Sequence, residues 1–135
     1  MKDQIKSLLA KYIAEEHNII GSNNLDDYTE KIFLNATILA HYEQGKLAGF
    51  IAYYNNHPSR ESAFLTMLIV DRDFRSTGLG KRLLCQSLAD LRKKQYKKIL
   101  LEVKTENSRA VSMYERNGFK KIEERGDLWL MEAYL

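Results

Sequence analysis

The sequence predicts one α+β (mixed α/β) domain built around a mixed sheet. Its 135 residues, 44% of them hydrophobic, match the commonest domain size and supply enough apolar side chains for a single core. Apolar residues recur at helical spacing near the N-terminus, give way to β-branched and aromatic runs from residue 37, and then alternate between both patterns. A helix separates the central strand from the next, so those two strands are expected to run parallel.

Two helices are expected before the sheet begins. Residues 3–16 carry an apolar stripe at helical spacing, made by Ile5, Leu8, Leu9, Tyr12 and Ile13. Asp3 is placed to meet the positive end of the helix dipole. After a break at residues 21–24, Leu25, Tyr28 and Ile32 fall on one face and predict a shorter helix over residues 25–33.

Three strands are expected to follow. Residues 37–42 and 47–54 are rich in β-branched and aromatic side chains and flank a turn at residues 43–46, which predicts a β-hairpin. Residues 63–70 are apolar on both faces, with only Thr66 interrupting. This pattern is typical of a strand in the middle of a covered sheet.

The second half of the chain predicts two more helices and three strands. The helix from Leu79 has cations at residues 92–94 in its last turn, and its core-facing stripe consists of Leu79, Leu83, Leu84, Leu88 and Leu91. A strand at residues 98–104 and a helix at residues 107–117 come next, and Gly118 ends the helix. Two short strands at residues 119–122 and 128–134 complete the domain.

The charge pattern argues against a polymeric ligand. The 21 Lys and Arg residues are interspersed with 18 Asp and Glu residues, so the formal net charge of +3 forms no nucleic-acid-binding arm. A small anionic ligand suits this balance better. Residues 1–6 are too polar for a secretory signal, and no apolar run reaches the length of a membrane span. We therefore expect a cytoplasmic protein without membrane contact.

The cysteine and histidine content predicts neither a disulfide nor a metal site. Cys85, the single cysteine, lies among leucines in an expected helix, where we expect it to be buried as a small apolar residue in a reducing compartment. The histidines, His17, His41 and His57, are scattered rather than spaced as ligands.

A glycine-containing loop joins the central strand to the next helix: Arg75, Ser76, Thr77, Gly78, Leu79, Gly80 and Lys81. The first amides of a helix have no intrahelical partner and the helix dipole is positive there, so this junction suits a phosphate group. Gly78 and Gly80 let an anion approach the backbone, and Arg75 and Lys81 add positive charge.

Two well-known phosphate loops do not fit this segment. A Walker A motif fails because Arg82 follows Lys81, and the dinucleotide fingerprint fails because Leu83 replaces its third glycine. The plain structural alternative is a turn in which Ser76 or Thr77 caps the helix.

A second set of residues lies downstream at fixed spacing: Leu101, Glu102, Val103, Asn107, Ala110, Met113, Tyr114, Gly118 and Phe119. With this set the chain resembles the GNAT superfamily of acetyl-CoA-dependent N-acetyltransferases. The phosphate loop of that family has three fixed places, which Arg75, Gly78 and Gly80 fill here. The two motifs in this order are far more specific than either alone, and the resemblance covers residues 64–119.

The resemblance implies a fold. A central mixed, mostly antiparallel sheet with splayed middle strands is expected, flanked by about four helices, with residues 1–135 forming a single N-acetyltransferase domain. Family members usually begin with a strand ahead of the first helix. This chain enters its helix almost at Met1, so the first strand is expected to be missing.

By the same resemblance, acetyl-CoA is expected to be the cosubstrate. The pyrophosphate is expected on loop residues Arg75, Ser76, Thr77, Gly78, Leu79, Gly80 and Lys81. The pantetheine arm is expected along the backbone of Leu68, Ile69 and Val70. Asn107 matches a residue that often contacts this arm, and since Asn is also a favoured helix N-cap, both roles are compatible.

Acetyl transfer to an amine needs two proton movements, so an acid and a base are sought among the residues. Tyr114 matches the family's acid, because a phenol with a pKa of about 10 stays protonated at neutral pH and can donate to the leaving thiolate. The alternative is an aromatic core residue. Glu102, 12 residues earlier, matches the base of protein N-terminal acetyltransferases in this superfamily; the alternative is a strand-end carboxylate that meets solvent or a lysine. Asp71, Glu61 and His41 are rival bases, and proton loss through water needs none.

The sequence thus predicts transfer of acetyl from acetyl-CoA to a primary amine by direct attack in a ternary complex, since Cys85 is not expected to be an exposed nucleophile. The acceptor stays open between a protein or peptide amine and a small-molecule amine. A non-catalytic CoA-binding regulatory module and a nucleic-acid-binding domain are the alternatives, and the second lacks clustered cations. A homodimer is compatible with Trp129, which is either a core residue or a dimer contact.

Overall fold

The computed structural model describes residues 1–16 and 25–135 of the chain. The expected break at residues 21–24 and His17 lie outside the described residues. Within them, no helix is both long and apolar enough to cross a membrane.

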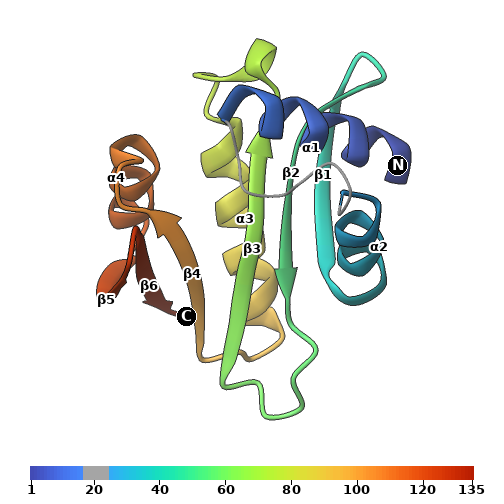
Figure 1. Cartoon of the computed structure of the whole chain (residues 1–135). Helices are drawn as coiled ribbons and strands as arrows, with labels where there is room; N and C mark the ends of the chain where they lie inside the picture. Colours follow the sequence, from blue (N-terminus) through green and yellow to red (C-terminus); the bar gives the residue numbers. More distant parts are fainter. Residues whose placement is uncertain (17–24) are drawn as a thin grey trace.

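One mixed sheet runs through the molecule (Figure 1). Its order is β1-β2-β3-β4-β6-β5. The parallel pair is β3 with β4, and the other neighbouring strands are antiparallel, as predicted. The strands are β1 (Thr37–Glu43), β2 (Lys46–Tyr54), β3 (Ser62–Val70), β4 (Lys98–Lys104), β5 (Lys120–Arg125) and β6 (Leu128–Tyr134).

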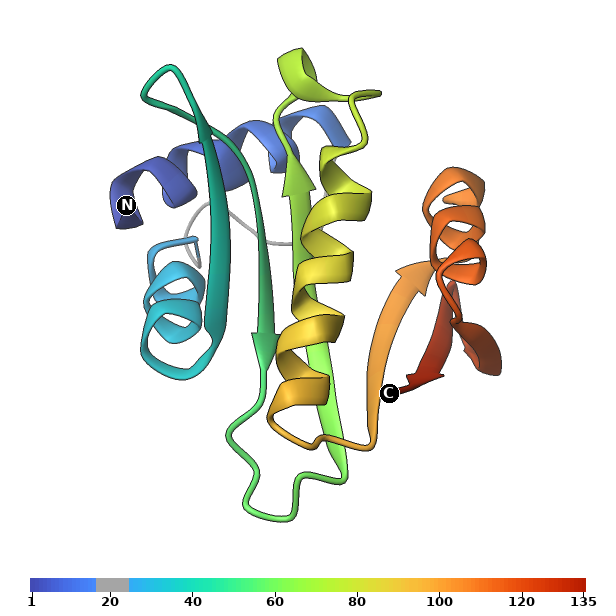
Figure 2. The same cartoon turned by 180° about the vertical axis from the view of Figure 1, so that it is seen from behind.

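Helices cover both faces of the β1–β3 half of the sheet. The first two, α1 (Lys2–Glu16) and α2 (Leu25–Asn35), pack on one face, and α3 (Leu79–Lys93) packs on the other, as the two opposite views show (Figures 1 and 2). The last helix, α4 (Ser108–Arg116), adds Val111 and Tyr114 to the core on the α3 side. Two separate hydrophobic clusters result, one on each face.

Most element predictions are confirmed, and the differences have local causes. The last hairpin's first strand extends to Arg125, beyond the predicted residues 119–122, because it pairs with β6 along its length. A short 3-10 helix at Arg72–Phe74 was not predicted. Asp71 caps it by accepting the Asp73 N–H at 3.0 Å.

The prediction that Cys85 is buried is wrong, because its side chain is exposed on α3. The buried stripe of this helix runs through Leu84, Leu88 and Leu91. One residue along a helix turns the side chain by about 100°, so Cys85 falls beside this stripe rather than on it. Its Sγ lies 3.8 Å from Oδ1 of Asn117, near the end of α4.

Trp129 of β6 is half-buried and packs against the core, with the Lys121 ammonium 4.6 Å from its ring centroid. Trp129 therefore has packing partners within its own chain, as the core alternative predicts. The homodimer stays a prediction.

A bulge in β3 sets the shape of the sheet. Ala52 pairs with Met67 and Tyr53 pairs with Leu65, so Thr66 has no partner on β2. An extra residue bends a strand and increases its twist. Pairing between β3 and β4 ends at Leu65, the residue before this bulge, so the two strands splay apart beyond that point. One face of β3 is therefore only partly covered, because Phe64, Thr66 and Leu68 are half-buried. The sequence pattern had predicted a strand that is covered on both faces.

Gly49 supports the splayed end of β3 from behind. A β-carbon at this position would lie 2.9 Å from the carbonyl oxygen of Ile69 and 3.3 Å from Cα of Val70. Both contacts are to backbone, so the strand itself must move to admit a side chain.

We therefore predict that Gly49→Ala lowers the free energy of unfolding by about 1–3 kcal/mol, the usual cost of forcing an extra carbon into a packed site. Urea denaturation measures this change. Gly80→Ala is the control, because its β-carbon meets only ordinary contacts at 3.7 and 3.9 Å. Equal stability of Gly49→Ala and the unaltered protein would contradict the close approach.

Candidate active site

Two adjoining cavities lie where β3 and β4 separate. The strand cavity, about 650 Å³, is lined by the bulged part of β3, the end of β4 and aromatic residues of α1 and α2. The loop cavity, about 850 Å³, is lined by the end of β3, the loop before α3, and α4. The cavities meet, because they share lining residues: Tyr12, Leu68, Ile69, Asn107, Ala110 and Tyr114.

The loop before α3 presents backbone to the loop cavity. Gly78 is the N-cap of α3, with φ at 82°, and no side chain caps the helix. The two alternative caps are engaged elsewhere: Thr77 donates its hydroxyl to the Phe74 carbonyl at 2.6 Å, and the Ser76 hydroxyl accepts from Arg109 at 3.1 Å. The first amides of α3 are thus left for an anion.

Four cations among the described residues line the loop cavity, and the sequence alone pointed to only two of them, Arg75 and Lys81. The others, Arg109 and Arg116, belong to α4 and approach the loop only in the folded chain. Arg75 also donates its Nε–H to the Val70 carbonyl at 3.1 Å, which joins the loop to the end of β3. This concentration of positive charge fits a diphosphate.

The space beside Gly80 indicates whether the loop cavity can hold a diphosphate. A β-carbon there would meet Val70 Cγ2 at 3.7 Å and Met113 Sδ at 3.9 Å, both of which belong to residues lining the cavity. Any side chain at this position would extend along the cavity wall. The absence of one leaves space and bare amides together, which suits a bulky anionic cofactor.

Residues Leu68, Ile69 and Val70 line the loop cavity as an unpaired edge. They pair with β2 on one side and have no partner on β4, whose pairing has already ended. Their backbone is thus open on the side where an extended arm would lie. Thr77, by contrast, is the one predicted loop residue that does not line the cavity.

Tyr114 stands at the junction of the two cavities. Its side chain, 7% exposed, packs edge-on against Phe119 with ring centroids 5.5 Å apart. Burial, with a smaller effect from Tyr12, raises the pKa of the Tyr114 phenol, so it holds its proton throughout the neutral range. Asn107 lines both cavities too, and its side chain caps α4 by accepting the Ala110 N–H at 3.2 Å, as predicted.

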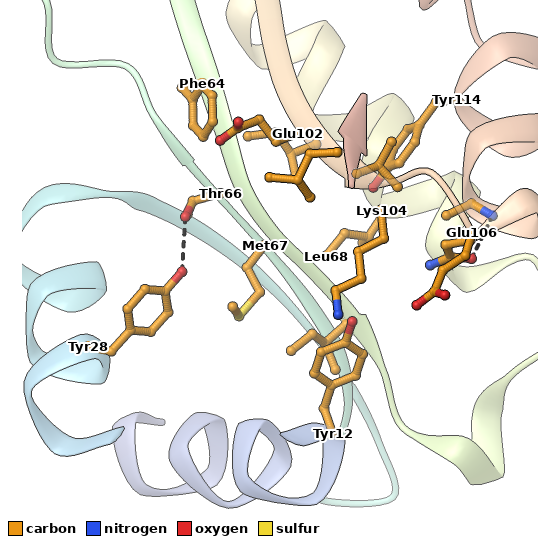
Figure 3. A pocket seen from close by; sticks show the side chains of 16 residues that line it. Tyr12, Tyr28, Phe64, Thr66, Met67, Leu68, Glu102, Lys104, Glu106 and Tyr114 are labelled. Carbon is orange, nitrogen blue, oxygen red and sulfur yellow. Dashed lines mark hydrogen bonds between the residues drawn. The ribbon is translucent and has the colours of Figure 1, made fainter. Parts of the chain in front are cut away.

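Glu102 lines the strand cavity but not the loop cavity (Figure 3). Its side chain is about a third exposed, and its carboxylate lies 3.8 Å from the Arg125 guanidinium. The rival bases lie elsewhere. Glu61 pairs with Lys97 at 2.8 Å and His41 with Glu43 at 2.8 Å, and neither lines either cavity.

Asp71, the third rival, has a structural role. It is 2% exposed and its carboxylate accepts from Lys11 of α1 at 2.9 Å, with Lys46 at 3.7 Å. Burial alone would raise the pKa of Asp71, but the Lys11 hydrogen bond, the Asp73 amide and the two lysine charges together lower it. The ionised carboxylate therefore ties α1 to the end of β3.

Comparison with known proteins agrees with this geometry. The Acetyltransferase (GNAT) family profile matches residues 3–119. The chain belongs to this family. It is 28% identical over 124 residues to N-alpha-acetyltransferase 30 of Dictyostelium discoideum, an alignment that covers 88% of this chain and 62% of that protein. It is 32% identical over 87 residues to a probable spermine N(1)-acetyltransferase of Bacillus subtilis subsp. natto, with 58% of this chain and 56% of that protein covered.

The GNAT fold is also found in solved structures. The PaiA N-acetyltransferase of Thermoplasma acidophilum, crystallised in complex with coenzyme A, superimposes with a TM-score of 0.80 at 19% identity, covering 99% of this chain and 92% of that one. The mixed sheet with splayed middle strands is therefore a GNAT sheet. The first element that the structure describes is α1.

Several cavity residues of this GNAT domain were missed by sequence reasoning. Tyr12 and Tyr28 were interpreted only as members of apolar helix stripes, yet both line the strand cavity. The Tyr28 hydroxyl lies 3.1 Å from the Thr66 hydroxyl, so α2 is joined to the bulge (Figure 3). The available signal was the phenolic hydroxyl, which needs a polar partner at the edge of an apolar stripe. No feature of the sequence marked Lys104 or Glu106 as residues that line the cavity.

The Asp71 interactions predict a pH-dependent contribution to stability. Because the folded-state pKa is lowered, this contribution is present above the ordinary value of 3.8 and is lost as pH falls through the lowered value. Asp71→Asn should lower the free energy of unfolding at pH 7 by about 1–3 kcal/mol, as expected for hydrogen bonds to charged groups. The difference between the two proteins should shrink at acidic pH.

Urea denaturation at several pH values measures this effect. Asp73→Asn is the matched control, since its side chain is 68% exposed and its ion pair with Lys46 should contribute little. A constant difference between Asp71→Asn and the unaltered protein down to pH 2 would refute the linkage.

Proposed function

We propose that the protein transfers the acetyl group of acetyl-CoA to a primary amine. One observation carries this proposal: Tyr114 faces both cavities, whereas Glu102 faces only the strand cavity. A thioester held in the loop cavity and an amine held in the strand cavity would meet beside Tyr114. An acid at the junction and a base on the amine side form an arrangement that suits acetyl transfer.

The loop cavity is the proposed acetyl-CoA site. The amides of Leu79, Gly80 and Lys81 would hold the pyrophosphate at the N-terminus of α3, with Arg75 and the α4 arginines neutralising its charge. The backbone of Leu68, Ile69 and Val70 would bind the pantetheine amides, and Asn107 lies where that arm would pass. The thioester supplies the activated acetyl group.

The protein's own groups would move two protons. Glu102 accepts a proton from the ammonium of the acceptor, which leaves a free amine to attack the thioester carbonyl. As the C–S bond breaks, Tyr114 donates its proton to the departing sulfur, and the second proton lost by the acetylated nitrogen restores the phenol. The raised pKa of Tyr114 keeps the phenol protonated before this step. Attack is direct, because Cys85, although exposed, lines neither cavity.

The relatives support an amine acceptor. One is named for the acetylation of α-amino groups and another for the acetylation of spermine. The chain spans 62% and 56% of their lengths, so we infer from them the class of reaction and not the acceptor.

The phosphate loop gives a binding prediction. Gly78 and Gly126 both have positive φ, 82° and 63°, and a β-carbon at either would meet nothing within 4 Å. Gly78→Ala and Gly126→Ala should therefore lose similar stability, about 1 kcal/mol. Only Gly78→Ala should weaken CoA binding, by about tenfold or more, because it distorts the helix N-terminus that holds the pyrophosphate.

Isothermal titration with CoA checks this expectation. The temperature of unfolding, recorded for both variants, separates a binding defect from a folding defect. Unchanged CoA affinity in folded Gly78→Ala would remove the loop from the proposal.

The proposed acid and base give a kinetic prediction. Tyr114→Phe should lower kcat by roughly a hundredfold or more without weakening CoA binding, since a positioned acid contributes about that much. Glu102→Gln should lower kcat/KM, because it removes the proposed base from the amine side of the site. Thiol release from acetyl-CoA over a panel of primary amines measures both.

Two matched controls accompany these variants. Tyr53→Phe removes a hydroxyl that donates to Asp90 at 2.6 Å, away from both cavities, and Glu61→Gln removes a carboxylate paired with Lys97. Both should keep normal turnover. Full activity of Tyr114→Phe would remove the assigned acid. CoA binding without turnover of any amine would instead favour the non-catalytic CoA-binding module.

A further inference from the structure

Lys104 is the one cation among the described residues that line the strand cavity. It is the last residue of β4 and is half-buried. Figure 3 shows its side chain extending across the cavity in the direction of Tyr12, away from the carboxylate of Glu106. Among the side chains that the structure describes, in residues 1–14 and 25–135, no carboxylate forms an ion pair with it.

A half-buried lysine with no carboxylate partner among the described side chains can offer its charge to a ligand in the cavity. Partial burial removes water from the charge and strengthens its attraction to an anion. Two lysines at the opposite end of β4 illustrate the contrast. Lys98, its first residue, lies 3.6 Å from Glu132, and Lys97, just before the strand, lies 2.8 Å from Glu61. The free charge of Lys104 is thus available to a ligand that enters the cavity.

Lys104 and Glu102 face the cavity from the same strand, two residues apart. Alternate residues of a strand share a face, and their Cα atoms are about 7 Å apart. An acceptor whose amine lies at Glu102 would therefore bring its next atoms toward Lys104. A second positive charge on the acceptor would be repelled there, and a negative charge would be attracted.

On this basis, and resting on the proposed transferase function, we propose that Lys104 selects acceptors that carry an anionic group close to the reacting amine. The acceptor class is a primary amine with a carboxylate about 5–10 Å away, a spacing set by the distance between alternate strand residues. A peptide with a free N-terminus and an acidic second residue has this chemistry, and so does a small ω-amino acid. A polyamine has the opposite charge.

Initial rates with matched acceptors test the proposal. The first pair is a C-terminally amidated peptide with aspartate or asparagine in second place, and the second pair is 4-aminobutanoate and its amide. The anionic member of at least one pair should be preferred by about tenfold in kcat/KM, and spermine should be poor. The pair that shows the preference identifies a peptide or a small molecule as the source of the carboxylate.

Variants of Lys104 connect the preference to this residue. Lys104→Gln should reduce the ratio to about one, and Lys104→Glu should favour a peptide with lysine in second place over the aspartate peptide. Lys120→Gln on exposed β5 is the matched control and should keep the ratio. CoA affinity and unfolding temperature, measured for each variant, show that the fold and the loop cavity are intact; Lys104→Met replaces any variant that does not fold.

The outcomes separate this inference from the function on which it rests. Acetylation of all the amines without a charge preference, a preference that persists in Lys104→Gln, or better turnover of spermine than of the anionic acceptors would overturn the role of Lys104 alone. CoA binding with no acetylation of any amine would overturn the transferase function and this inference together.

Discussion

The end of pairing between β3 and β4 is the constraint on which the site depends. Up to Leu65 the two strands form an ordinary parallel pair, and beyond it the bulge at Thr66 turns β3 away. Both cavities open into the resulting gap. The unpaired backbone of residues 68–70 and the position of Tyr114 follow from it, because each faces a space that continuous pairing would have closed.

Other parts of the chain hold this gap open. Gly49 allows β2 to approach the end of β3 so closely that a β-carbon would touch its backbone. The Tyr28 hydroxyl meets Thr66 at the bulge itself, and Asp71 binds α1 through Lys11 just beyond the strand. These contacts come from three different elements, so the shape of the gap is a property of the packed domain rather than of β3 alone.

The sequence predicted the order of the helices and strands well, because the spacing of apolar residues changes clearly between helical and strand patterns at residues 37 and 79. Spacing that is local in the chain singled out the loop before α3 and Tyr114, which line the loop cavity; their roles stay predictions. The sequence could not predict the bulge, since Thr66 is a normal strand residue, or Arg109, Tyr12 and Lys104, which reach the cavities only through tertiary packing. The error at Cys85 came from composition: leucines surround it in sequence, but the helix directs it to another face.

The central claim is that the splayed backbone and the N-terminus of α3 form one acetyl-CoA site. Backbone amide chemical shifts, followed by NMR during titration with CoA, test it most directly because every non-proline residue reports separately. The account predicts that the largest changes fall on residues 68–70 and 78–81, with little change along β1 and β5. Changes concentrated outside the two cavities, with residues 78–81 unaffected, would contradict it.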